Sequence, residues 1–253
     1  MPKPLPVKLK KEPLIEAVCQ LRVASKVALH TFFPGLLLAR HPEEVSEIQQ
    51  LPSAGLPAQL RAMQPELAFA PLVQLKFKGV LILVGERSVT VSNPAPYLGW
   101  MAFKSLIINV FSYLIESKLI TAVERFSLKY TNVVRSTEKT SSLENLDWLV
   151  NVGKLHLNMP ATSMRTETVT HGLPTIINIT GAVLVQAAGQ APVEGTLIDV
   201  DTIFSGPQQT AEAFALSMAS ELDRVRKANK EVFFECLTDD AVNALEPTYD
   251  QHV

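Results

Sequence analysis

Cysteine, long apolar runs and a charge excess of one sign are all scarce in this sequence of 253 residues. Its two cysteines, Cys19 and Cys236, are too few for a disulfide framework. Cys19 lies in an alternating apolar pattern, so we expect a buried, reduced thiol there. Charged residues interrupt the longest apolar segments well before the ~18 residues needed to span a bilayer, and residues 1–12 lack the apolar core of a secretory signal. We therefore expect a soluble, cytoplasmic protein without a membrane partner.

The charge balance and the low aromatic content limit both the partners and the core. The formal net charge is −2 and the pI is about 6.2, so no overall basic field attracts nucleic acid. We therefore do not expect a nucleic-acid partner. Aromatic residues make up 7% of the chain and hydrophobic residues 47%, which predicts cores built mainly of Leu, Val, Ile and Ala.

The common catalytic motifs are absent as well. The sequence has no Gly-rich phosphate loop, dinucleotide fingerprint, Gly-x-Ser-x-Gly elbow or His-Glu-x-x-His pair. Its five histidines are scattered, and none has metal-ligand spacing to another histidine or to a cysteine. These absences predict no cofactor and no catalytic residues.

What is present predicts an α+β fold of two similar units. We expect each unit to be a mainly antiparallel sheet packed by one long amphipathic helix. A flexible arm rich in Pro and Lys is predicted at 1–13, followed by an N-terminal unit at 14–140 and a C-terminal unit at 141–253. The polar stretch at 136–145 suggests the boundary between the units.

In the N-terminal unit, apolar alternation predicts strands at 14–23, 73–77, 80–84 and 88–92, with a hairpin turn at 85–87. A long helix is expected to open near Tyr97. Its apolar stripe follows the spacing of one helix face: Trp100, Phe103, Ile107, Val110, Phe111 and Leu114. In the proline-rich connection between the first two strands, 31–35 predicts a turn and 42–50 a short exposed helix.

The segment 124–135 has the most regular alternation in the chain. Its inner row is predicted to be Phe126, Leu128, Tyr130, Asn132 and Val134. A buried amide such as Asn132 needs a hydrogen-bond partner, since an unmet one costs about 1–3 kcal/mol. The outer row carries Arg125, Lys129 and Arg135, which could meet phosphate groups, although a solvated sheet face is the favoured interpretation.

The C-terminal unit is predicted to contain strands at 175–186, with a bulge at Gly181, and at 195–205. A helix should run from Ala211 to about Phe233, and Thr238 should cap a short last helix. Asp199 and Asp201 share one strand face about 7 Å apart. They could bind a divalent metal or divide acid and base roles, but an exposed sheet face is the favoured interpretation.

Several short segments resemble a known group of proteins. They are Lys-Glu-Pro-Leu-Ile-Glu-Ala-Val at 11–18, Phe-Pro-Gly at 33–35, Tyr-Leu-Gly-Trp-Met-Ala-Phe at 97–103, Arg-Phe-Ser-Leu-Lys-Tyr-Thr-Asn at 125–132 and Gly-Thr-Leu-Ile-Asp-Val-Asp at 195–201. In this order they resemble a family of uncharacterised bacterial proteins of about 250 residues that is sporadically distributed among genomes. The resemblance spans nearly the whole chain and implies a shared fold, but it supplies no catalytic residues. The histidine that it leads us to expect near 228–233 is missing.

The function that these patterns favour is a non-enzymatic protein-binding or assembly module. We take as candidate binding residues six members of the patterned segments: Tyr97, Trp100, Arg125, Lys129, Tyr130 and Asn132. The expected partner is a protein or peptide, held by strand addition at a sheet edge or along a helix, and a homodimer is one form of it. By analogy, the sporadic distribution suggests an accessory role in defence or toxin control. The alternative is a metal- or nucleotide-dependent enzyme with its site between the two units.

Overall fold

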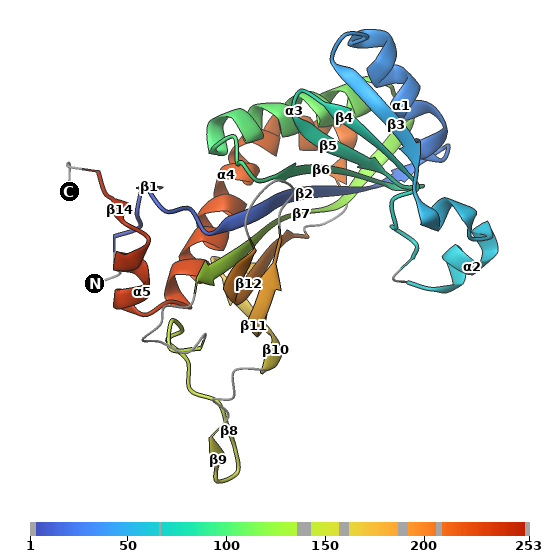
Figure 1. The fold of residues 1–253 in the computed structure, drawn as a ribbon. Helices are drawn as coiled ribbons and strands as arrows, with labels where there is room; N and C mark the ends of the chain where they lie inside the picture. Colours follow the sequence, from blue (N-terminus) through green and yellow to red (C-terminus); the bar gives the residue numbers. More distant parts are fainter. Residues whose placement is uncertain are drawn as a thin grey trace. The chain divides into compact units, whose positions relative to one another are not determined.

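The computed structural model describes residues 4–65, 67–135, 143–156, 162–186, 192–205 and 209–250. Its secondary structure is mixed helix and mainly antiparallel sheet, which confirms the α+β class (Figure 1). The chain divides into two compact units. Unit 1 comprises Met1–Glu16, Lys129–Thr202 and Arg226–Val253, and unit 2 comprises Ala17–Leu128 and Ile203–Val225. Each unit therefore combines separate stretches of the chain, whereas the sequence predicted two consecutive ones.

Unit 2 is built on an antiparallel sheet whose strands follow the order β7-β2-β6-β5-β4-β3. The strands are β2 (Leu14–Ser25), β3 (Val45–Gln50), β4 (Val73–Phe77), β5 (Val80–Val84), β6 (Ser88–Pro94) and β7 (Ile120–Arg135), with the short β13 (Gln209–Thr210) beside β7. The predicted alternation places Leu75, Ile82 and Val91 together on the inner face, all fully buried. Cys19 is also buried, as predicted.

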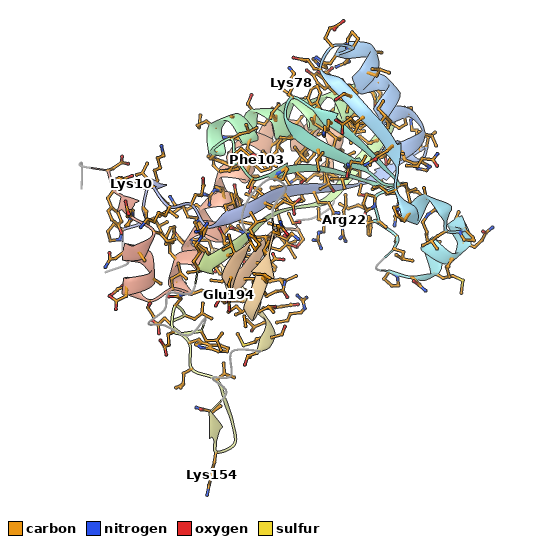
Figure 2. All side chains as sticks on the ribbon, in the orientation of Figure 1. Lys10, Arg22, Lys78, Phe103, Lys154 and Glu194 are labelled. Atoms are coloured by element: carbon orange, nitrogen blue, oxygen red, sulfur yellow. The ribbon has the colours of Figure 1, made fainter. Side chains whose placement is uncertain are left out.

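Helices cover the inner face of this sheet. Helix α1 (Leu29–Arg40) packs on β4 and β5, and α3 (Trp100–Glu116) packs on β6. The stripe predicted for α3 is buried at every position after Trp100, including Phe103, which is labelled in Figure 2. Two short elements, η1 (Pro52–Gly55) and α2 (Ala58–Met63), belong to the proline-rich connection.

Two predictions in the connection are wrong. Residues 31–35, predicted as a turn, lie inside α1, where Pro34 is tolerated because Leu29, Phe33 and Leu37 bury the same helix face. Residues 45–50, predicted within a helix at 42–50, form β3 instead. Pairing of Val45 with Phe77 and of Gln50 with Val73 on β4 overrides the local composition.

Unit 1 is built on a second run of antiparallel strands in the order β10-β11-β12-β7. The strands are β10 (Ser163–Thr170), β11 (Leu173–Val185) and β12 (Val193–Phe204), followed by the C-terminal part of β7. The predicted bulge near Gly181 is confirmed, because the β11–β12 register shifts between Thr180 and Val183. A separate hairpin joins β8 (Asn151–Val152) to β9 (Leu155–His156).

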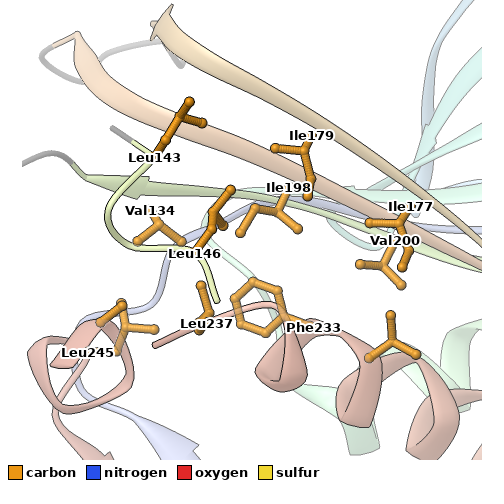
Figure 3. Packing of buried hydrophobic residues seen from close by; sticks show 12 residues of the cluster. Val134, Leu143, Leu146, Ile177, Ile179, Ile198, Val200, Phe233, Leu237 and Leu245 are labelled. Atoms are coloured by element: carbon orange, nitrogen blue, oxygen red, sulfur yellow. The ribbon is translucent and has the colours of Figure 1, made fainter. Parts of the chain in front are cut away.

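The core of unit 1 forms where the inner faces of β11, β12 and β7 meet the last turns of α4 (Ala211–Glu235). Figure 3 shows Ile177, Ile198 and Val200 facing Phe233 across this core. Helix α5 (Asp239–Ala244) follows and begins as predicted, because Thr238 Oγ1 accepts a hydrogen bond from the Ala241 amide at 3.2 Å.

Part of the segment predicted as a flexible arm, 1–13, has paired backbone in the described structure. Strand β1 (Lys8–Leu9) pairs with β14 (Pro247–Thr248), and the amides of Lys10 and Lys11 donate to backbone carbonyls of the same C-terminal segment. Lys10 and Lys11 also form ion pairs with Glu246. Residues 7–11 are thus held by backbone hydrogen bonds that their composition does not reveal.

Two further predictions concern the boundary between the units and the absence of a membrane-spanning segment. Residues 136–142 of the predicted boundary lie outside the described residues. No helix in the described stretches is long and apolar enough to cross a bilayer.

Candidate functional site

Asp199 and Asp201 lie together on the outer face of unit 1, opposite the face that carries Ile198 and Val200. Asp199 stands directly across from Asn178 of β11. The register continues across β11 to β10, where Arg165 stands across from Asn178. Three polar residues therefore lie in register across three strands, and we call them the polar row: Arg165, Asn178 and Asp199.

Asp199 forms an ion pair with a lysine of the neighbouring strand. Lys129 Nζ of β7 lies 3.6 Å from Asp199 Oδ2. Burial raises the pKa of the Asp199 carboxyl, the charge of Lys129 opposes that rise, and Asp201 and Glu16 add to it. The second carboxylate oxygen, Oδ1, is buried without a hydrogen-bond partner in both Asp199 and Asp201. The pair thus combines partial burial with incomplete neutralisation.

The aspartate pair offers few ligands for a metal. Within the described residues, no group of three or more His, Cys, Asp or Glu side chains could hold an ion. Calcium takes about six to eight oxygen ligands, and Lys129 already supplies one positive charge to Asp199. The arrangement is that of a half-buried ion pair on a sheet face.

The other predicted binding residues are engaged within their own units. In unit 1, Tyr130 is 4% exposed and lies under the Arg226 guanidinium, whose central carbon is 4.4 Å from the ring centroid. Asn132 is 5% exposed and belongs to the interior. Neither side chain presents a surface that a partner could contact.

In unit 2, the candidate aromatic residues connect structural elements. Trp100 Nε1 donates to Asp223 Oδ1 at 3.0 Å, and Lys104 Nζ lies 2.6 Å from Asp223 Oδ2. The Tyr97 and Phe103 rings meet edge to face with centroids 5.9 Å apart. Arg125 has a buried Nε without a hydrogen-bond partner. Tyr97 and Trp100 are thus explained by packing within this unit.

Strand β10 presents a different kind of site, because it ends the strand order of unit 1. It is joined to β11 by a two-residue turn in which His171 and Gly172 have φ of 51° and 74°. Positive φ at both positions is the geometry of the tight turns that match strand twist. The register with β11 then runs unbroken from Thr170–Leu173 to Ser163–Thr180. Among the described strands, none pairs with the other edge of β10.

The backbone of β10 alternates between a paired and an open side. The Gly181 amide donates to the Thr162 carbonyl at 2.9 Å, so this opposing pair is hydrogen-bonded. In an antiparallel ladder, hydrogen-bonded pairs recur at every second residue. The even-numbered residues of β10 therefore bond to β11, and the odd-numbered residues direct their backbone groups outward. The outward set is Ser163, Arg165, Glu167 and Val169, all exposed.

Strand β3, which ends the strand order of unit 2, is protected against pairing with another strand, whereas β10 is not. The β3–β4 register shifts between Ser46 and Gln49, and Glu47 has a φ of 52°. Glu47 also forms an ion pair with Lys76 of β4 at 2.6 Å. A bulge of this kind bends an edge strand and hinders strand addition there, and the register of β10 has no such shift. The sequence does not single out the open edge of β10, because which strand lies beside it depends on long-range pairing.

Comparisons with protein-family models and with curated proteins found no match to this chain. The resemblance to the sporadically distributed bacterial family stays a prediction from the sequence.

Proposed function

We propose that the protein is a non-enzymatic binding module that adds an extended polypeptide segment to the open edge of β10. The observation that carries this proposal is the regular, unbulged edge of β10, with four outward-facing residues and no strand beside it in the described structure. Strand addition uses backbone hydrogen bonds for affinity and alternate side chains for specificity. A cytoplasmic setting, which the sequence predicts, is part of the same proposal.

The contrast between the two end strands supports the assignment to β10. Natural sheets usually protect their edges against pairing, and β3 carries such protection in its bulge, which β10 lacks. The outward row of β10 instead offers one cation, Arg165, one anion, Glu167, and Val169, which is 68% exposed. A strand added here would extend the sheet and continue the polar row.

The test is amide hydrogen exchange by NMR in the presence of octapeptides from an alternating polar and β-branched library. A bound strand should protect the amides of Arg165, Glu167 and Val169, because their N–H groups point outward. The amides of Met164, Thr166 and Thr168 are already bonded to β11 and should change little. Library binders that leave the odd-numbered amides unprotected would overturn the proposal.

A proline substitution with a matched control sharpens this test. Glu167→Pro removes one outward N–H group at an edge position that tolerates proline. We expect it to weaken peptide binding by roughly tenfold, since one backbone hydrogen bond contributes about 0.5–1.5 kcal/mol. Glu167→Ala keeps the N–H group and should bind neutral peptides like the parent chain.

The second candidate function is a metal- or nucleotide-dependent enzyme that uses Asp199 and Asp201. The observation in its favour is the pair of buried Oδ1 atoms without hydrogen-bond partners. A thermal-shift screen with divalent metals and nucleotides tests it. Stabilisation that disappears in the Asp199→Ala, Asp201→Ala double variant would favour this function over strand addition.

A further inference from the structure

We propose that the strand added to β10 is β10 of a second copy of this chain, paired antiparallel about a two-fold axis at Thr166. This inference rests on the proposed strand-adding function and names its partner. An isologous pairing of this kind uses the same surface on both copies. Three properties of β10 select it: the alternation of its backbone, the order of its charges and the self-matching of its other side chains.

The backbone alternation restricts the registers available to two copies. Only odd-numbered residues of β10 direct their N–H and C=O groups outward, so a hydrogen-bonded pair must join two odd-numbered residues. A two-fold axis then falls on a single residue of the strand. An axis at Thr166 pairs Ser163 with Val169 and Arg165 with Glu167 of the other copy, and it uses the whole outward set.

The charges distinguish this register from its neighbours. With the axis at Thr166, Arg165 of each copy lies opposite Glu167 of the other, so two ion pairs form across the interface. With the axis moved to position 165 or 167, Arg165 faces Arg165 or Glu167 faces Glu167. Opposite charges directly across an antiparallel pair contribute roughly 0.2–1 kcal/mol, and like charges there are destabilising.

The remaining side chains are compatible with the same axis. Thr166 meets Thr166 and Met164 meets Thr168 on the inner face, and threonine pairs across strands are favourable. Met164 already packs against the core cluster of unit 1. In the single chain, Arg165 Nη2 lies 2.9 Å from Glu167 Oε1, with the two side chains 54% and 66% exposed. This exposed pair contributes little by itself, so it can exchange partners across the interface.

The test is a charge-swap series measured by sedimentation velocity over a range of protein concentrations. We expect the parent chain to show a concentration-dependent monomer–dimer equilibrium. Arg165→Glu and Glu167→Arg each place like charges opposite one another at both positions, and each should weaken dimerisation by roughly tenfold or more. The double variant Arg165→Glu, Glu167→Arg restores opposite charges and should dimerise like the parent.

Mixing the two single variants gives a stronger prediction. A chain with Glu at 165 and 167 is complementary to a chain with Arg at both positions, so the mixture should form a heterodimer although each variant alone is monomeric. Lys154→Glu is the matched control for Arg165→Glu, because it makes the same charge change at the β8–β9 hairpin (Figure 2). It should leave the monomer–dimer equilibrium unchanged.

The outcomes separate this inference from the proposed function. A parent chain that stays monomeric at millimolar concentration, while library peptides still protect the odd-numbered amides, would overturn self-pairing and leave strand addition standing. A dimer unaffected by the single charge swaps would place the interface elsewhere and also overturn the inference. Circular dichroism of each variant establishes that it folds, so a monomeric variant reports on pairing.

Discussion

At the scale of single residues, Asp199 should make stability depend on pH. Burial raises the pKa of its carboxyl in the folded chain, so the folded state holds the proton more tightly than the unfolded state. The free energy of unfolding should therefore fall as pH rises from the ordinary aspartate pKa through the raised one. Asp199→Asn should remove this fall and be more stable than the parent above that window. Urea unfolding at pH values from about 3 to about 8 measures this dependence, because the range includes the ordinary aspartate pKa of about 3.9.

Lys129→Met is the companion change for that measurement. Removing the cation 3.6 Å from Asp199 Oδ2 takes away the interaction that opposes the pKa rise. In this variant, the pH range over which the free energy of unfolding falls should extend to higher pH. A parent chain and an Asp199→Asn variant with parallel pH profiles would contradict the assignment of the buried charge to Asp199.

A second residue, Asn229, should be important for the stability of unit 1. It is 1% exposed, and its Nδ2 donates to the Val200 carbonyl at 2.7 Å and reaches Thr202 Oγ1 at 3.3 Å. Asn229→Ala leaves buried groups of β12 without this donor, which should lower the free energy of unfolding by about 1–3 kcal/mol. Chemical denaturation measures the loss. The exposed Asn243→Ala serves as control and should change stability by less than about 0.5 kcal/mol.

At the scale of elements, alanine substitutions at two glycines should change the stability of the chain in opposite directions. A Cβ at Gly195 would lie 2.2 Å from the Val134 carbonyl oxygen, so Gly195→Ala forces β12 and β7 apart. A Cβ at Gly35, inside α1, would meet nothing within 4 Å. Gly35→Ala should therefore stabilise the chain by about 0.5–1 kcal/mol, and Gly195→Ala should destabilise it by more than that. Thermal unfolding of both variants checks the signs, and equal signs would be inconsistent with this packing.

The elements also show where sequence patterns succeed. Strand β7 and helix α3 were predicted from alternation and spacing, because one face of each is continuously buried. Strand β3 was missed because only Val45 of its six residues is buried, so pairing with β4, and no local pattern, decides its conformation. Residues 31–35 were predicted as a turn, yet they lie in α1, whose buried side chains outweigh the hydrogen bond that Pro34 lacks.

The candidate site was only partly accessible to the same reasoning. Period-two alternation placed Asp199 and Asp201 on one face, and the structure brings Lys129 to Asp199. It did not reveal that Tyr130 lies under Arg226, because that contact joins residues far apart in the chain. The open edge of β10 depends on which strand lies beside it, and a single segment of sequence carries no record of its neighbours.

At the scale of the whole molecule, the interleaved units explain why the predicted boundary and the observed division differ. Unit boundaries fall inside β2, β7, β12 and α4, so single uninterrupted elements contribute residues to both units. Composition changes mark linkers, but no linker separates these units along the chain. A division of this kind can be identified only once the long-range strand pairing is known.

Self-pairing through β10 also predicts how the stability of the whole chain depends on its concentration. A dimer that binds only folded chains shifts the folding equilibrium by mass action, so the thermal midpoint should rise with protein concentration. Above the dissociation constant, each tenfold increase adds about 1.4 kcal/mol per dimer, or about 1–3 °C in the midpoint for a chain of this size. In Arg165→Glu the rise should begin only at roughly tenfold or more higher concentration, and Arg165→Glu with Glu167→Arg should regain the parent's dependence. Differential scanning fluorimetry at protein concentrations that span roughly three orders of magnitude measures the change in the thermal midpoint. A slope shared by the parent and the Arg165→Glu variant would locate the association at another surface, because only β10 carries the swapped charge.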